Sequence, residues 1–174
     1  LMFTTGLRVG EVVALQMDDI CEDIVRVSKT ETKYKIGEHY EYEVLDRPKT
    51  EAGIRNVLVP KSYLWVLSNL EKYGGKPYIF VNKRGERLHT QAVRKRMYQI
   101  CSKLEIERRS PHKARKTYGS ILLDNRVNSK IIEKQMGHTD ISVTEISYHR
   151  DRKRLEEKRE VINAIPEFEN YFEN

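Results

Sequence analysis

The sequence predicts a mainly α-helical α+β domain with a small antiparallel β-sheet near its N-terminal end. Most of the chain places apolar residues three and four positions apart, as helices with one buried face do. Three segments between residues 23 and 60 instead alternate apolar and polar residues and are rich in Val and Tyr, which is typical of short strands. The 174 residues can bury one substantial core and include no linker rich in Pro, Gly or Ser, so we expect one domain.

The N-terminal third carries the predicted sheet. A helix is expected first, in RVGEVVALQMDDI, where one face holds Val9, Val12, Val13 and Met17. Strands are then expected at residues 23–30, 39–46 and 54–60, and together they would form one antiparallel sheet. The segment 31–38, with Gly37 as its turn residue, is expected to connect the first two strands, and the segment 47–55 reverses the chain before the third.

The rest of the chain is predicted to be mostly helical. KSYLWVLSNLEKYGG predicts a helix closed by Gly74 and Gly75, and KPYIFVNKRGE predicts a short apolar run with a turn. The next helix is expected at residues 90–106, with Thr90 as its N-cap. Further helices are predicted at residues 113–125, 128–137 and 152–165, and the second of these ends at Gly137.

Charge is distributed unevenly along a chain whose formal net charge is +6. Residues 83–116 hold twelve Lys or Arg against three Glu, whereas residues 156–174 hold six Glu against two basic residues. A basic block of this kind suits a polyanion such as nucleic acid. For an isolated block a merely solvated charged face is the commoner explanation, so charge alone does not establish binding to a polyanion.

Composition excludes several other classes of protein. No run of about 18 apolar residues is present to span a bilayer, and no segment resembles a signal peptide. Cys21 and Cys101 lie far apart in the sequence, without the ligand spacing of a zinc site or the density of a disulfide framework. We therefore expect a cytoplasmic protein with no membrane partner.

Five short motifs contain residues that could carry chemistry: Arg8 in TGLRVGE, Lys49 in RPKTEAGIR, His112 and Arg115 in SPHKARKTYGS, His138 in MGHTD, and Tyr148 ten positions later. Three-residue spacing places His112 and Arg115 on one side of a helix that Ser110 and Pro111 would start. Taken singly, each residue has an ordinary structural explanation. Arg8 could pair with Glu11, His138 could cap a helix, and Lys49 could be a solubilising charge.

The order of these motifs resembles the catalytic domain of the tyrosine recombinases, the phage integrase family. The resemblance extends from TTGLRVGEVVAL to GHTDISVTEISY and covers nearly the whole chain. It is strongest to integrases of conjugative transposons and temperate phages of Gram-positive bacteria. One departure is that His149 follows Tyr148 directly, whereas many relatives place a histidine two residues after the tyrosine.

The resemblance implies a site-specific recombinase that integrates or excises a mobile element through a transient 3′-phosphotyrosine, with no metal ion and no cofactor. It implies that Tyr148 is the nucleophile and that Arg8 and Arg115 are the cations that stabilise the phosphate. His138 would hydrogen-bond to the same phosphate, His112 would assist proton transfer, and Lys49 would protonate the departing 5′ oxygen.

The resemblance also implies an organisation and partners. We expect residues 1–174 to be a catalytic-domain fragment that lacks the family's N-terminal core-binding domain and any arm-binding domain. Residues 151–174 would form a tail helix that docks on a neighbouring protomer or folds back on its own domain. The expected partners are double-stranded DNA, further copies of the protein in a homotetramer, and accessory DNA-bending or excision factors.

Three other functions remain open at this point. A non-catalytic DNA-binding module would use only the basic block, and a type IB topoisomerase-like enzyme would use the same chemistry to relax supercoils. A metal-dependent nuclease built on His112 and His138 is the third.

Overall fold

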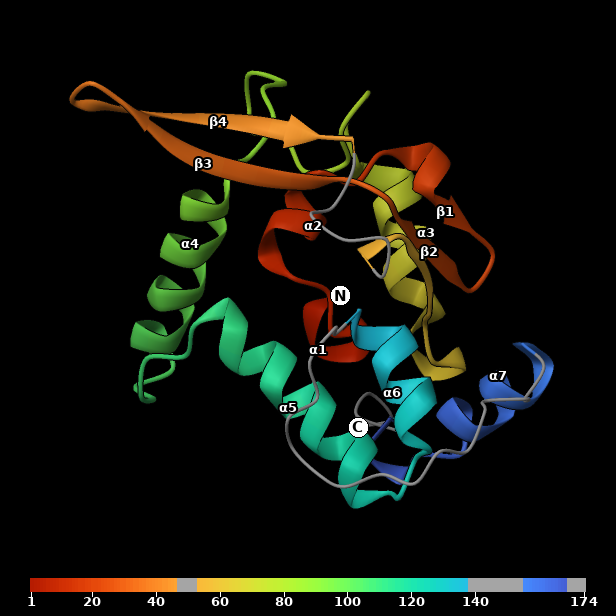
Figure 1. The fold of residues 1–174 in the computed structure, drawn as a ribbon. Helices are drawn as coiled ribbons and strands as arrows, with labels where there is room; N and C mark the ends of the chain where they lie inside the picture. The colour runs from red at the N-terminus through yellow and green to blue at the C-terminus, as the bar shows by residue number, and fades with distance from the viewer. Residues whose placement is uncertain (47–52, 138–154, 169–174) are drawn as a thin grey trace.

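The computed structural model describes residues 1–46, 53–137 and 155–168 (Figure 1). Its helices are α1 (Met2–Thr5), α2 (Val9–Val13), α3 (Leu64–Tyr73), α4 (Thr90–Lys103), α5 (Pro111–Asp124), α6 (Ser129–Met136) and α7 (Leu155–Asn163). Its strands are β1 (Ile20–Cys21), β2 (Ile24–Val27), β3 (Thr30–Ile36), β4 (His39–Leu45) and β5 (Arg55–Leu58). Short 3-10 turns lie at Met17–Asp19, Lys61–Tyr63 and Pro166–Phe168. The predicted α+β class, mainly helical with little sheet, is confirmed.

The strands form two antiparallel sheets, so the prediction of one sheet is wrong. One sheet has the order β1-β2-β5, and the other is the β3-β4 hairpin. The segment 31–38 was expected to be only a connection, yet most of it is strand β3, paired with β4 along its full length. Most side chains on the outer part of this hairpin are exposed on both faces, and Lys33 lies 3.6 Å from the centre of the Tyr40 ring. With no buried face, β3 lacks the apolar alternation by which strands are recognised.

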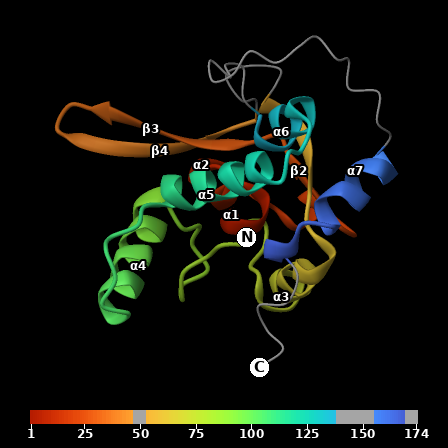
Figure 2. The same ribbon diagram turned by 90° about the horizontal axis from the view of Figure 1, so that it is seen from below.

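The hairpin extends beyond the rest of the fold on the side where α4 lies (Figures 1 and 2). Its base is tied to the start of α4 by Glu31, whose buried carboxylate accepts hydrogen bonds from Arg87, from His89 Nδ1 at 2.8 Å and from the backbone N–H of Thr90 at 2.8 Å. The N-cap of α4 is therefore His89, and the prediction of Thr90 as the cap is wrong. A tertiary carboxylate satisfies the helix N-terminus where a local side chain was expected to do so.

Helix α2 ends at Val13, earlier than predicted from the apolar spacing that continues to Met17. The carbonyl oxygen of Leu15 accepts a hydrogen bond at 3.0 Å from the N–H of Ile79, a residue distant in the sequence. Asp19 then caps a 3-10 turn by accepting from the N–H of Gln16 at 2.9 Å. The helices predicted in the second half of the chain are confirmed, apart from shifts of a few residues at their ends. Of the last predicted helix, residues 152–154 lie outside the described residues.

The core lies between the three-stranded sheet and helices α5, α6 and α7. It contains Val25, Val27 and Val57 from the sheet and Tyr118, Leu122, Ile131 and Ile132 from α5 and α6. Ile162, Ile165 and Phe168 complete it from the C-terminal segment, and Arg159 forms two bonds to Asp23, of 2.7 and 3.0 Å. The described part of the tail, residues 155–168, thus packs on its own domain.

Gly6 allows α1 and α2 to meet α5 closely. It has a positive φ of 65°, and a Cβ built at this position would lie 2.5 Å from Cδ1 of Tyr118. Any other residue would be strained and would push α5 away. This close approach brings the chain around Arg8 against α5. Among the described residues, no helix is both long and apolar enough to cross a membrane.

Candidate active site

Arg8 is the N-cap residue of α2 and is held there by Glu11. The Glu11 carboxylate accepts from the Arg8 backbone N–H at 2.7 Å and from Arg8 Nη1 at 2.8 Å. A glutamate three positions into a helix commonly reaches back to the N-cap backbone in this way. The ion pair expected from the sequence is present, and the Arg8 side chain nevertheless remains 44% exposed, so it is also available to a ligand.

Arg55 also binds Glu11, and the sequence analysis did not single it out. It lies at the start of β5, is 8% exposed, and donates from Nη1 and Nη2 to the two Glu11 oxygens at 2.9 and 2.8 Å. The inward positions of β5 include Arg55 and Val57, so an arginine takes a core-facing place in an apolar strand. The signal that could have identified Arg55 is a charged residue at a core-facing position of the strand predicted at residues 54–60, because a buried arginine requires a partner.

Arg115 reaches the same region from α5 and is 4% exposed. Its Nη1 donates to the carbonyl oxygen of Gly6, and its Nη2 donates to that of Met136 at 2.6 Å. Burial lowers the pKa of Arg115 to about 10, and the positive charges of Arg8 and Arg55 act in the same direction, while Glu11 partly opposes them. The group therefore stays protonated at neutral pH.

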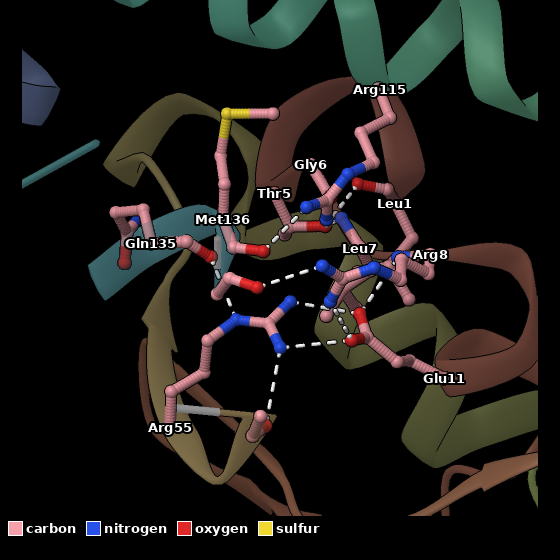
Figure 3. Close-up of polar contacts among 12 residues, drawn as sticks. Leu1, Thr5, Gly6, Leu7, Arg8, Glu11, Arg55, Arg115, Gln135 and Met136 are labelled. Atoms are coloured by element: carbon pink, nitrogen blue, oxygen red, sulfur yellow. Dashed lines mark hydrogen bonds and ion pairs between the residues drawn. The ribbon is translucent and has the colours of Figure 1, made fainter. Parts of the chain in front are cut away.

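The three arginines meet at the C-terminal end of α6 (Figure 3). The carbonyl oxygens of Gln135, Met136 and Gly137 accept from Arg55 at 2.9 Å, from Arg115 at 2.6 Å and from Arg8 at 2.7 Å. The last carbonyls of a helix lack partners within it and carry partial negative charge, so guanidinium groups are well suited to them. One helix end thus orients three guanidinium groups.

Gly137 ends α6 with a positive φ of 62°, as the sequence predicts. His138 is the next residue in the chain, so it comes directly after the helix end that binds the three arginines.

A cavity of about 500 Å³ lies beside these arginines. It is lined by Leu7, Arg8, Val9, Arg94, Tyr98, Ser110, Pro111, His112 and Arg115. The structure therefore brings together Arg8, His112 and Arg115, three of the six predicted catalytic residues, from two separate parts of the chain. His112 is exposed in the first turn of α5, which starts with Pro111 as predicted. Converging cations with a histidine at the rim fit an anionic ligand such as a phosphodiester.

Lys49, His138 and Tyr148 lie outside the described residues. Two residues that border their segments do contact the cluster. The carbonyl oxygen of Gly53 accepts from Arg55 Nη1 at 3.3 Å, and that of Gly137 accepts from Arg8. In the part of the chain that is described, no three His, Cys, Asp or Glu side chains are grouped so that they could hold a metal ion.

Two buried carboxylates should make the fold sensitive to acid. Burial would raise the pKa of Glu11, but Arg55 and Arg8 outweigh it and lower the pKa below the ordinary value of 4.5. The pKa of Glu31 is lowered in the same way, since the hydrogen bonds from Thr90, His89 and Arg87 outweigh burial. A carboxylate with a depressed pKa in the folded state stabilises the fold above its unfolded pKa, and this stabilisation is lost as the pH falls through the folded pKa.

We therefore expect the free energy of unfolding to decrease as the pH falls below 4.5, the ordinary pKa of both groups. Urea unfolding of the unmodified protein and Glu31→Gln over a series of pH values would measure this. The variant should be less stable at neutral pH and lose less stability on acidification, whereas Glu71→Gln, at an exposed position on α3, should behave as the unmodified protein does. If Glu31→Gln and the unmodified protein lose equal stability on acidification, the Glu31 carboxylate does not contribute to the acid sensitivity of the fold.

Comparison with known proteins places these observations in a family. The family model described as "Phage integrase family" matches residues 1–154. The tyrosine recombinase XerD of Chlamydia trachomatis is 28% identical over 158 residues, which are 90% of this chain and 48% of that protein. The tyrosine recombinase XerC of Vibrio parahaemolyticus is 30% identical over 159 residues, or 89% of this chain and 46% of that protein. The chain thus spans about half the length of these curated relatives.

A solved structure shows the same fold. The integrase of the Tn1549 transposon, in complex with a circular intermediate DNA, superposes with a TM-score of 0.68 at 21% sequence identity, over 80% of this chain and 49% of that one.

Proposed function

The chain belongs to the phage integrase family, and from this premise we propose that it is the catalytic part of a site-specific DNA recombinase. The observation that carries the proposal is the convergence of Arg8 and Arg115 on one helix end, beside a cavity that His112 also lines. Cations fixed in advance stabilise the charge that develops on a phosphate without having to reorganise, and this is usually the largest catalytic effect.

The proposed reaction is a transesterification. The Tyr148 hydroxyl attacks the scissile phosphorus, a bond forms between phosphorus and the tyrosine oxygen, and the bond to the 5′ oxygen breaks. His112 accepts the tyrosine proton, and Lys49 donates a proton to the departing 5′ oxygen. The reverse reaction, with the 5′ hydroxyl of another strand as the attacking group, rejoins the DNA and releases the tyrosine, so the phosphodiester bond energy is retained.

The arginines have donors to spare for this role. A guanidinium has five N–H donors, and the bonds of Arg115 to Gly6 and Met136 use only two of them. Arg8 likewise gives one N–H to Glu11 and one to Gly137. Donors from both groups are then available to the non-bridging oxygens of one phosphate, and His138 is proposed to bind the same phosphate.

The test is covalent trapping of the protein on DNA. The intact protein is incubated in EDTA with a duplex that carries the end sequence of the mobile element and a nick beside the cleavage position, and the products are separated on a denaturing gel. We expect a protein–DNA adduct that Tyr148→Phe abolishes and that Tyr73→Phe, at a 72% exposed tyrosine, leaves unchanged. If the protein binds the duplex without forming any adduct, it is a non-catalytic DNA-binding module. Relaxation of supercoils without strand exchange would favour the topoisomerase-like function.

We also propose that double-stranded DNA is the partner and that the intact protein acts as a homotetramer on it. The domain organisation expected from the sequence, the accessory factors and the likeness to integrases of Gram-positive mobile elements stay predictions. Docking of the tail in trans would require residues 155–168 to leave the surface that they cover here and to occupy the same surface on a neighbour. Ile162, Ile165 and Phe168 are buried on their own domain here, so docking of the tail in trans stays a prediction.

A further inference from the structure

Arg55 contacts Glu11 and the end of α6 but is not among the residues that line the cavity. Its Nη1 and Nη2 bind the Glu11 carboxylate, its Nε donates to the carbonyl oxygen of Gln135 at the end of α6, and its Nη1 also lies 3.3 Å from the carbonyl oxygen of Gly53. Its side chain is 5% exposed. A residue so placed does not line the cavity in which a DNA phosphate would bind, so we expect it to act through its neighbours and through its charge.

Glu11 is the first of these neighbours, and Arg55 shares it with Arg8. Oε1 of Glu11 accepts from Arg8 Nη1 and from Arg55 Nη1, while Oε2 accepts from the Arg8 backbone and from Arg55 Nη2 (Figure 3). Without Arg55, Arg8 would be the one arginine among the described residues that still binds this buried carboxylate. Glu11 would then draw further Arg8 donors toward itself and away from the cavity, because a buried carboxylate requires full compensation.

The charge balance of the cluster depends on Arg55 as well. Arg8, Arg55 and Arg115 contribute three positive charges against the one negative charge of Glu11. Removing Arg55 lowers the net charge of these four residues from +2 to +1. A phosphodiester under attack gains negative charge, so the transition state loses stabilisation more than the bound ground state does.

The end of α6 is the second neighbour. A Cβ built on Gly137 would lie 2.7 Å from Nη1 and 2.9 Å from Cζ of Arg55, so the guanidinium lies directly against the backbone of Gly137. Arg55 thus supports the helix end whose carbonyl oxygens orient Arg8 and Arg115.

We propose that Arg55 is a positioning residue for strand cleavage: it compensates Glu11 and supports the end of α6 so that Arg8 keeps its free N–H donors directed at the scissile phosphate. This inference rests on the proposed function of the site. Arg55 itself is not among the residues that line the cavity.

The test compares two DNA substrates that differ only at the scissile position. One is the nicked duplex with which the unmodified protein forms the covalent adduct, and the other carries a methylphosphonate there, which lacks one negatively charged oxygen. Arg55→Lys should bind the phosphodiester duplex within about threefold of the unmodified protein but form the adduct about 10- to 100-fold more slowly. On the methylphosphonate, Arg55→Lys should form the adduct only a few-fold more slowly than the unmodified protein, because less phosphate charge remains to be stabilised. The rate deficit of Arg8→Ala should shrink in the same way.

A matched control and a double variant separate positioning from folding. Arg159 lies on the tail and also forms two bonds to one carboxylate, that of Asp23. Arg159→Lys should form the adduct as fast as the unmodified protein does on each of the two substrates. Arg55→Met combined with Glu11→Gln removes both charges of the buried pair, and it should form adduct faster than Arg55→Met alone, since Arg8 is then no longer drawn to an uncompensated carboxylate.

The outcomes are distinguishable from failure of the proposed function. Absence of any adduct with the unmodified protein would refute the function itself. If the unmodified protein forms the adduct but Arg55→Lys is equally slow on both substrates, or the double variant is no faster than Arg55→Met, Arg55 is only a structural residue and the inference is wrong. Urea unfolding of each variant shows that the assays use folded protein, and the double variant decides the matter if Arg55→Lys does not fold.

Discussion

Replacing Arg115 with lysine is expected to slow formation of the covalent protein–DNA adduct by about 10²- to 10³-fold, the usual effect of losing one positioned donor at a developing oxyanion. Arg115 holds Gly6 and Met136 with two nitrogens of one planar group and still has donors for a phosphate. A lysine ammonium is a compact point charge on a flexible stem, so it cannot span both carbonyl oxygens and face the cavity at once. The charge is kept and the geometry is lost.

Single-turnover adduct formation on the nicked duplex would measure the effect, with DNA affinity determined separately. Arg126→Lys, an exposed position in the loop after α5, is the matched control and should behave as the unmodified protein does. Urea unfolding would separate a catalytic deficit from loss of fold, because the buried carbonyl oxygens left by Arg115 also weaken the junction of α1, α5 and α6. An Arg115→Lys variant with near-normal cleavage would show that only the charge of this group matters.

Replacing Phe168 with alanine is expected to lower the free energy of unfolding by about 3–5 kcal/mol, the usual range for a buried phenylalanine. Phe168 is completely buried, its ring stacks on Tyr118 with 5.9 Å between centres, and it meets Tyr63 edge-on at 6.0 Å. Removing the ring leaves a cavity between α5 and the start of α3. It also detaches the tail from the helix that carries Arg115.

Urea unfolding compared with Phe3→Ala would test this prediction. Phe3 is 39% exposed, so its truncation should lower the free energy of unfolding by less than about 1 kcal/mol. A similarly small effect at Phe168 would mean that residues 155–168 do not occupy this surface in the isolated chain, which would favour docking on a neighbouring protomer.

Much of the fold could be predicted because it depends on residues close together in the sequence. The helices α3 to α6, the start of α5 at Pro111 and the end of α6 at Gly137 follow from apolar spacing and from the backbone preferences of proline and glycine. The pairing of β3 with β4 was missed, since an exposed hairpin with polar residues on both faces has no apolar face to reveal it.

The candidate site divides in the same way. The order of the motifs indicated the family, and that resemblance selected Arg8, His112 and Arg115, since each residue taken singly has an ordinary structural explanation. Residue type alone did not reveal Arg55, since an arginine near a strand start is usually a surface charge.

The sequence by itself determined helices α3, α5 and α6 and the glycine that ends α6, which depend on local spacing and backbone preference, while its resemblance to a family supplied the candidate catalytic groups. Only the tertiary structure decided what holds those groups. The bonds from Arg8 to Gly137 and from Arg115 to Gly6 join residues 129 and 109 positions apart, and that from Arg55 to Glu11 spans 44. The physical reason is that a buried charge takes whichever partner the packing of distant elements brings within hydrogen-bonding distance, and local sequence patterns carry no record of that choice.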